Sequence, residues 1–125
     1  MWYDYLEENF FIKKIFKIVP DLKSITILDV HFDLASSRLK IFIKMSKFVD
    51  YPPKKWGKPG LYTFYIELSF YNISNIHFFE YNNMKKSSDI QITMENELIR
   101  FSSMGTIDMD FNAEAGVIQS IKIYY

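Results

Sequence analysis

The feature that most constrains the fold is the apolar stretch from Leu61 to Tyr81, which holds more aromatic and β-branched residues than any other stretch of its length. From Tyr62 to Phe70, large apolar side chains recur at every second position. This period of two is typical of a strand with one face in the protein core. The pattern predicts that this strand buries the following side chains: Phe64, Ile66, Leu68 and Phe70.

The second half of the same stretch shows the alternation again. Residues 72–75 are mostly polar and can turn the chain. Ile76 and Phe78 then alternate with His77 and Phe79. We therefore expect a second strand that pairs back along the first and shares its buried face, so that the two form a central hairpin.

A short helix is predicted near the start of the chain, from Phe10 to Ile18, with Asn9 as its cap and Pro20 ending it. At 100° per residue its two faces separate well. The apolar face holds Phe11, Ile12, Ile15, Phe16 and Ile18, and the opposite face holds Lys13, Lys14 and Lys17. We expect the helix to pack on a sheet with its lysines in solvent, in preference to lying on a membrane or binding calmodulin.

The remaining segments also alternate and are separated by turn residues. Strands are expected at residues 25–33, 38–46, 90–94, 98–102, 107–111 and 117–124. The first two should form a hairpin, and the turn residues Glu95 and Asn96 should join 90–94 to 98–102 in another. The stretch from Asp50 to Gly60 holds three of the four prolines and must be the principal loop. The sequence predicts one domain over residues 1–125, of class α+β. It is predominantly an antiparallel twisted β-sheet of about eight strands, with one short N-terminal helix packed on it.

Composition excludes several classes of function. The chain of 125 residues has no cysteine, which rules out disulfides, a thiol nucleophile and a zinc–thiolate site. Fifteen basic and fifteen acidic residues leave no net charge that would attract nucleic acid or an anionic membrane. The N-terminal stretch lacks the pattern of a signal peptide and no apolar run approaches a membrane span, so we expect a cytoplasmic location.

One strand pattern resembles a metal site. Asp29, His31 and Asp33 share a strand face at spacings of about 6 to 7 Å and could join in binding a divalent metal. The same spacing arises in any strand that turns a polar face to water. We favour that second interpretation and predict no metal.

Another pattern resembles the start of a calcium-binding loop, at Asp108, Asp110 and Asn112. It fails because Ala113 stands where the loop needs glycine, and Gln119 stands where it needs glutamate. The chain also lacks a GxSxG motif and a glycine-rich phosphate loop. We therefore predict no catalytic residues, no cofactor and no enzymatic activity.

The densest basic and aromatic cluster lies in the principal loop, at Lys54, Lys55, Trp56 and Lys58. A nucleic-acid strand could stack on the indole. The favoured alternative is that Trp56 folds under the proline loop while the lysines stay in solvent.

Four segments of the chain resemble the immunity protein 50 family of bacterial polymorphic toxin systems. They are the Trp2–Tyr3 pair, the turn from Pro20 to Leu22, the proline-rich segment from Pro52 to Trp56, and the alternating strand with its polar turn from Tyr62 to Ile76. They occur here in the order that the family shows, and the likeness spans most of residues 1–81.

The resemblance implies a small cytoplasmic protein that neutralises a cognate toxin domain by direct, non-catalytic binding. For the surface that binds this partner, our first candidate is the loop of Lys54, Lys55, Trp56 and Lys58. The face of Asp29, His31 and Asp33 is the second.

The alternative function is a small-ligand-binding protein or an enzyme, with a site in the concavity of the curved sheet. A pocket lined by His31 or His77 would favour this alternative. A flat patch of aromatic and charged side chains would favour toxin binding.

Overall fold

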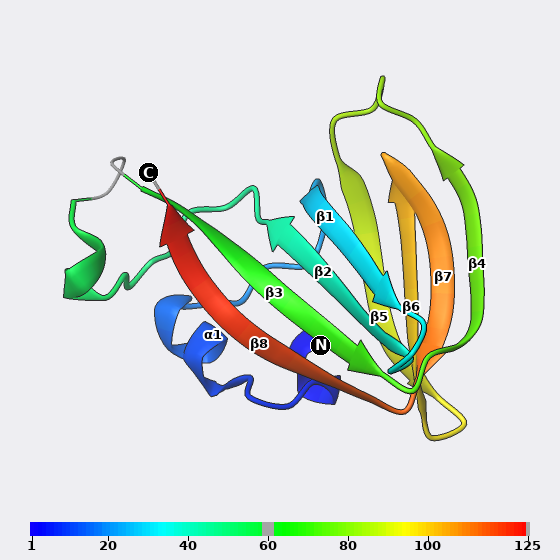
Figure 1. Cartoon of the computed structure of the whole chain (residues 1–125). Coiled ribbons are helices and arrows are strands. Elements are labelled where there is room, and N and C mark those ends of the chain that lie inside the picture. Colours follow the sequence, from blue (N-terminus) through cyan, green and yellow to red (C-terminus); the bar gives the residue numbers. More distant parts are fainter. Residues whose placement is uncertain (59–61, 125) are drawn as a thin grey trace.

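The computed structural model describes residues 1–58 and 62–124, which form two four-stranded antiparallel sheets and a short helical N-terminal segment (Figure 1). Sheet A has the order β1-β2-β3-β8 and sheet B the order β4-β7-β6-β5. The strands are β1 (Thr26–Asp33), β2 (Arg38–Lys44), β3 (Thr63–Tyr71), β4 (Ser74–Tyr81), β5 (Ser88–Glu95), β6 (Leu98–Gly105), β7 (Ile107–Ala113) and β8 (Ala115–Tyr124). The predicted class, with eight antiparallel strands and one short helix, is confirmed.

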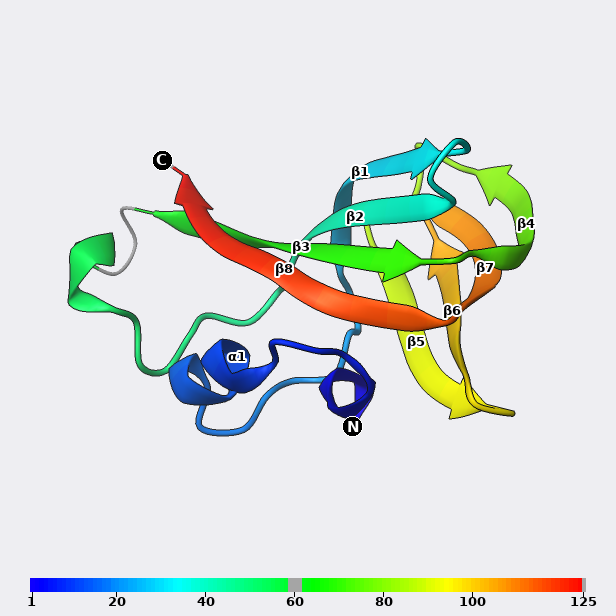
Figure 2. The ribbon, with the colours of Figure 1, turned by 60° about the horizontal axis from the view of Figure 1, so that its bottom comes forward.

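The helical segment consists of the 3-10 turn η1 (Trp2–Tyr5) and the helix α1 (Phe10–Ile15), which lie beneath β3 and β8 of sheet A (Figure 2). Ile12 and Ile15 are buried, and the lysines of the opposite face are exposed, as predicted. The indole Nε1–H of Trp2 donates to the carbonyl of Pro20 at 3.0 Å and ties this segment to the connection that follows.

The helix ends at Ile15 and not at Ile18, so the predicted end was wrong. Two backbone N–H groups from the principal loop, those of Asp50 and Tyr51, both donate to the carbonyl of Ile15 at 2.9 Å. The N–H of Lys17 donates to the Asp50 carboxylate at 2.8 Å. These bonds occupy the Ile15 carbonyl and the Lys17 N–H, which would otherwise bond within a longer helix. Ile18, beyond the end of the helix, is exposed.

Asn9 is also not the side-chain cap that the sequence predicts. Its amide Nδ2 donates to the carbonyl of Tyr3 at 2.8 Å and thereby links η1 to α1. Asn9 occupies the cap position, but its side chain bonds to η1 and does not accept a hydrogen bond from the first N–H groups of α1.

Two of the predicted hairpins form as expected. β1 pairs with β2 from Thr26↔Lys44 to Asp33↔Arg38. β5 pairs with β6, and both Asn96 and Glu97 in their two-residue turn have positive φ. Such φ values match the right-handed twist of paired strands.

The predicted central hairpin is wrong, because β3 and β4 belong to different sheets. β3 pairs with β2 and β8, and β4 pairs with β7. The turn between them is held by other loops: the N–H of Ile73 donates to the carbonyl and hydroxyl oxygens of Ser37, and the Asn72 amide donates to Glu114 at 2.8 Å. These contacts direct the chain across to sheet B. Leu61, which opens the apolar stretch, lies outside the described residues.

The core lies between the sheets and under the helical segment. The burial predicted for β3 is confirmed, because all four of its apolar side chains are at most 6% exposed: Phe64, Ile66, Leu68 and Phe70. Phe70, Phe101 and Phe111 form an aromatic cluster at the centre, with ring centroids 4.7 to 5.5 Å apart. No helix in the described part of the chain is long and apolar enough to cross a membrane.

Two of the four outer sheet edges are covered by the N-terminal segment. Glu7 bonds to β8 through Gly116 and Ile118, at 2.9 and 3.0 Å. Residues 22–25 bond to β5, through Leu22 to Ile90 and through a reciprocal pair between Ile25 and Ser88. Within the described residues β1 and β4 have no such cover, which leaves them as the two open edges of the molecule.

Candidate protein-binding surface on strand β4

Strand β4 is exposed along its whole length, although four of its eight side chains are apolar or aromatic. Phe78, Phe79 and Tyr81 are 62 to 66% exposed, and Ile76 is exposed as well. We call these four side chains, with His77 and Glu80 between them, the β4 surface. Soluble proteins rarely leave a contiguous apolar edge strand uncovered, because such an edge pairs readily with another chain.

The register with β7 explains why apolar side chains lie on both faces of β4. Phe78 stands opposite the buried Met109, whereas His77 stands opposite Asp110 on the outer face. The register shifts between Phe78 and Glu80, so the strand carries an irregularity at Phe79. The ring of Phe79 stacks on His77, with centroids 5.9 Å apart, on the outer side. The side chains of Phe78 and Phe79 therefore project from opposite faces of the strand.

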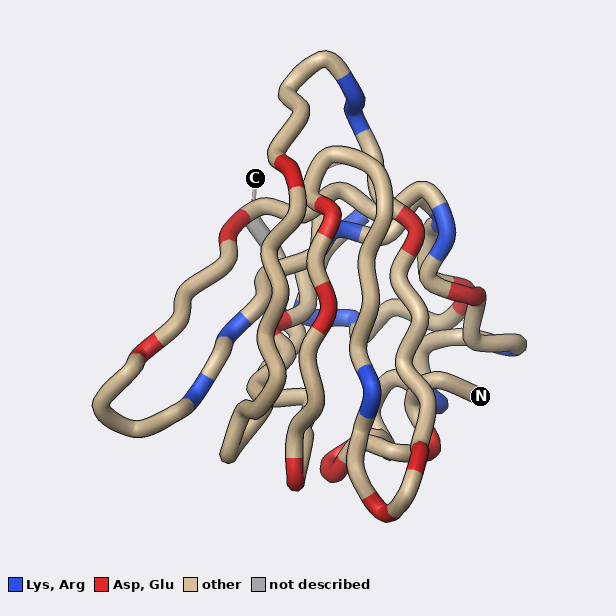
Figure 3. The backbone as a smooth tube through the Cα atoms, turned by 90° about the vertical axis from the view of Figure 1, so that its right-hand side faces the viewer, with Lys and Arg blue, Asp and Glu red and all other residues tan. Residues whose placement is uncertain are grey.

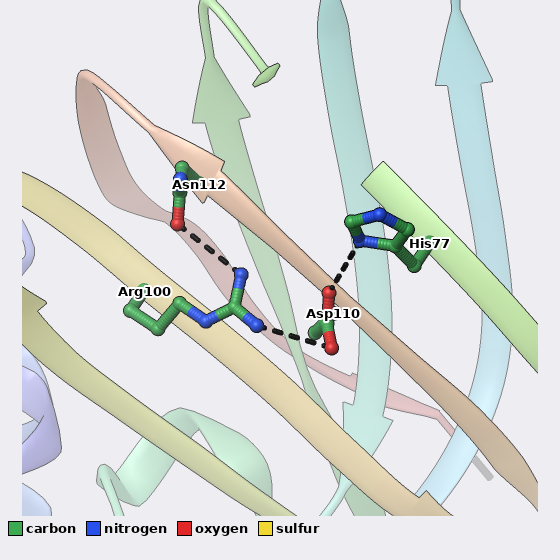
Figure 4. Close-up of polar contacts among 4 residues, drawn as sticks. All are labelled: His77, Arg100, Asp110 and Asn112. Carbon is green, nitrogen blue, oxygen red and sulfur yellow. Dashed lines mark hydrogen bonds and ion pairs between the residues drawn. The ribbon is translucent and has the colours of Figure 1, made fainter. Parts of the chain in front are cut away.

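A polar network on sheet B fixes the outer face next to β4 (Figure 4). Asp110 lies at its centre, with one carboxylate oxygen 3.0 Å from Nδ1 of His77 and the other 3.0 Å from Nη2 of Arg100. Arg100 also donates through Nη1 to the amide oxygen of Asn112 at 3.3 Å. Side chains from β4, β6 and β7 thus hold one another in place.

The network also sets which ring nitrogen of His77 carries a proton. An ionised carboxylate can only accept a hydrogen bond, so His77 donates to Asp110 through Nδ1–H. In the neutral ring Nε2 is then the acceptor. His77 is mostly exposed, so this nitrogen is available to a donor on a binding partner.

Carboxylates gather on the same side of the molecule. Glu80 stands directly opposite Asp108 in the β4–β7 ladder, and Asp110 lies two residues further along β7. Figure 3 views the molecule from the side on which β4 lies and shows acidic positions along several of its strands. Like charges placed directly opposite one another repel, and a cation between them would remove that repulsion.

The first candidate predicted from the sequence needs a correction. Trp56 is only 4% exposed, so the indole offers little surface to a partner, and the exposed part of this candidate is its lysines. Its ring stacks on Phe64 with centroids 6.0 Å apart and contacts Tyr62 and Phe11 edge-on. The burial that we favoured for this indole is what the structure shows. It belongs to the core between α1 and β3 because large apolar rings surround it.

The lysines of the same loop are placed differently. Lys54 and Lys55 lie in the 3-10 turn η2 (Lys54–Trp56), and Lys58 follows shortly after it. All three are exposed. Their role in binding a partner stays a prediction.

The second candidate, Asp29, His31 and Asp33, lies along the outer face of β1, with all three side chains exposed. No group of metal-ligating side chains capable of holding an ion is found among the described residues, these three included. Hydrogen bonds from the Ser36 hydroxyl and the Ala35 N–H hold the pKa of Asp33 below its usual value. Partner binding through this face also stays a prediction.

Neither histidine lines the three best-defined cavities among the described residues. The first of them, about 590 Å³, lies between the ends of β2 and β3, and its lining includes Lys44, Lys47, Phe48 and Tyr62. The next two are smaller, and the third lies beside Asp29, Phe42 and Tyr65. His77 instead lies on an open surface of aromatic and charged side chains, which is the arrangement that we expect of a toxin-binding protein.

Comparison with protein families gives a match to the one described as Immunity protein 50, over residues 8–124. The chain belongs to this family. The likeness drawn from residues 1–81 therefore extends through β8, close to the end of the chain. Searches of curated proteins and of solved structures returned no match. Membership supports a role as an immunity protein and, in general, a toxin as partner.

The β4 surface was not predicted from the sequence, although a signal was present. The segment from Ile76 to Tyr81 has apolar side chains on both faces. That pattern fits a strand buried on both sides and also an edge strand that binds another protein. Only the strand order distinguishes the two, because it places β4 at the margin of sheet B.

Proposed function

We propose that this protein neutralises a cognate toxin by direct, non-catalytic binding, and that the β4 surface makes the main contact. The observation that carries the proposal is the exposed aromatic edge strand in a member of the immunity protein 50 family. We place the protein in the cytoplasm, where a chain without cysteine needs no oxidising compartment.

The β4 surface has the composition of a binding hot spot. Aromatic side chains dominate the energetics of protein interfaces, and fully burying one is worth roughly 1.5 to 3 kcal/mol. Phe78, Phe79 and Tyr81 are each exposed by more than half in the free protein, so each has most of that contribution still to gain. The Asp110 network holds His77 beside them in a fixed geometry and lowers the entropy lost on binding.

The two surfaces predicted from the sequence remain candidates for additional contacts. Lys54, Lys55 and Lys58 would meet an acidic partner surface, and Asp29 and Asp33 would meet a basic one. Substitution of Trp56 cannot test the loop, because removing that ring disturbs the core. The informative loop variant replaces the three lysines with serine and leaves the indole in place.

The test is co-expression with the toxin domain encoded beside this protein. Wild-type protein should restore growth and co-purify with the toxin. A Phe78→Ser/Phe79→Ser variant should fold normally, because both rings are exposed, and should lose protection. Phe48→Ser is the matched control, since Phe48 is 83% exposed and lies in the loop after β2.

Full protection by the folded β4 variant would remove β4 as the main contact. In that case the triple lysine variant and an Asp29→Asn/Asp33→Asn variant would show whether either sequence-predicted surface takes its place. Failure of the wild-type protein to bind the neighbouring toxin would reject the proposed function itself.

A further inference from the structure

We infer that the partner binds β4 edge to edge, adding a strand to sheet B, and that this strand carries a lysine or arginine that lies against Glu80 and Asp108. The inference rests on the proposed function and specifies how the toxin is recognised. It predicts a partner surface with an exposed, cationic edge strand.

The backbone of β4 is free to pair on one side. Outside its ladder with β7, no backbone hydrogen bond joins β4 to another described residue. The N-terminal segment already occupies the edges of β8 and β5, through Glu7 and through residues 22–25. An added strand can therefore reach sheet B only at β4, unless it displaces part of the N-terminal segment.

The other open edge, β1, carries features that discourage pairing. Its outer face presents Asp29, His31 and Asp33, and its register shifts between Ile27 and Asp29. Charged side chains and bulges are the usual means by which edge strands avoid pairing with other chains. β4 has register shifts too, but most of its side chains from Ile76 to Tyr81 are apolar, and these favour contact.

The irregularities of β4 limit the length of the added strand. Asn75 has a φ of 50° and interrupts the extended backbone at the start of β4, so an added strand would pair between Ile76 and Tyr81, with the irregularity at Phe79 inside that stretch. A short strand there would gain backbone hydrogen bonds, while its side chains would meet Phe78 on one face and Phe79 on the other. Strand addition of this kind draws affinity from the backbone and specificity from alternate side chains.

Charge decides between a foreign strand and a second copy of this chain. Asp110 is paired with Arg100 and His77. Glu80 and Asp108 stand opposite each other, and neither forms an ion pair with another described residue. One carboxylate oxygen of Asp108 accepts a hydrogen bond from the N–H of Gly105 at 2.7 Å, so Glu80 is the carboxylate that a partner cation would compensate most. A second copy would add the same carboxylates to the same edge, whereas a guanidinium or ammonium group would compensate both.

Charge reversal at Glu80 tests this inference in the complex with the toxin domain. Glu80→Arg should weaken binding at least tenfold, Glu80→Gln should have a smaller effect, and added salt should reduce the difference between them. Glu95→Arg is the matched control, because Glu95 is an exposed glutamate on β5 of the same sheet. It should bind like the wild type.

Hydrogen exchange supplies the backbone readout. The N–H groups of β4 that point away from β7 should exchange fast in the free protein and be protected in the complex. Toxin that binds with unchanged affinity to Glu80→Arg, with no new protection on β4, would overturn strand addition and leave the proposed function standing. A wild-type protein that forms dimers through β4, lost in Phe78→Ser, would assign the edge to a second copy and also overturn the inference.

Discussion

Phe70 of β3 and Phe111 of β7 meet edge to face, with ring centroids 5.2 Å apart, and this contact joins sheet A to sheet B. Phe101 of β6 stacks on Phe111 at 4.7 Å and completes the cluster. All three rings are fully buried. The turn at Asn72 sends the chain from one sheet to the other, and the aromatic cluster holds the two sheets together.

Replacing Phe70 with alanine should lower the free energy of unfolding by roughly 3 to 5 kcal/mol, because the substitution leaves a large cavity between the sheets. Chemical denaturation monitored by circular dichroism would measure the loss. Phe48→Ala, at an exposed ring, should change stability by less than about 0.5 kcal/mol. A loss of under about 1 kcal/mol for Phe70→Ala would contradict the placement of this ring.

Gly105 should not tolerate a side chain. Its φ is 139°, a region that other residues rarely adopt, and an added Cβ would lie 2.3 Å from the carbonyl oxygen of Ser87. Backbone strain alone costs about 1 to 3 kcal/mol, and the clash with the Ser87 carbonyl adds to it, so Gly105→Ala should lower the free energy of unfolding by more than strain alone. A melting temperature equal to that of the wild type would show that the turn between β6 and β7 differs from the structure described here.

Asp33 should titrate below its ordinary value of 3.8, because the Ser36 hydroxyl donates to its carboxylate. A lowered folded-state pKa means that ionised Asp33 stabilises the fold above the unfolded value and loses this contribution as the pH falls through the folded one. In Ser36→Ala the pKa of Asp33 should rise toward the ordinary value. NMR titration of the carboxyl carbon would show this, with Thr26→Ala as a control that leaves it unchanged.

His77 should carry its proton on Nδ1 when the ring is neutral, since Asp110 accepts from that nitrogen. Long-range proton–nitrogen NMR spectra distinguish the two tautomers by their nitrogen shifts. In Asp110→Ala the preference for Nδ1–H should be lost, and Arg100 should lose its ion pair. A neutral ring protonated on Nε2 in the wild type would contradict the network in Figure 4.

Much of the fold could be predicted from alternation, because a strand with one face in the core shows its period in sequence. The burial of Phe70 and the β1–β2 hairpin follow from that period. Alternation does not reveal which strands pair, however. The separation of β3 from β4 depends on bonds made by Ser37 and Glu114, residues distant in sequence from the turn that they hold.

The same limit applies to the candidate sites. Trp56 is buried because Phe11 and Phe64, which lie before and after its loop in the sequence, pack around it. The end of α1 depends on Asp50, which lies 33 residues beyond Lys17. The exposure of Phe78 depends on the strand order of sheet B. In each case the deciding contact is long-range, and no local pattern records it.

The most direct test of the account is the dissociation constant of the toxin domain for wild-type protein and for Phe78→Ser/Phe79→Ser, measured by calorimetry. We predict tight binding by the wild type and a dissociation constant at least a hundredfold higher for the variant, which corresponds to about 2.8 kcal/mol. The Phe48→Ser control should bind like the wild type. Equal affinities for wild type and the folded double variant would contradict the claim that β4 is the surface that recognises the toxin.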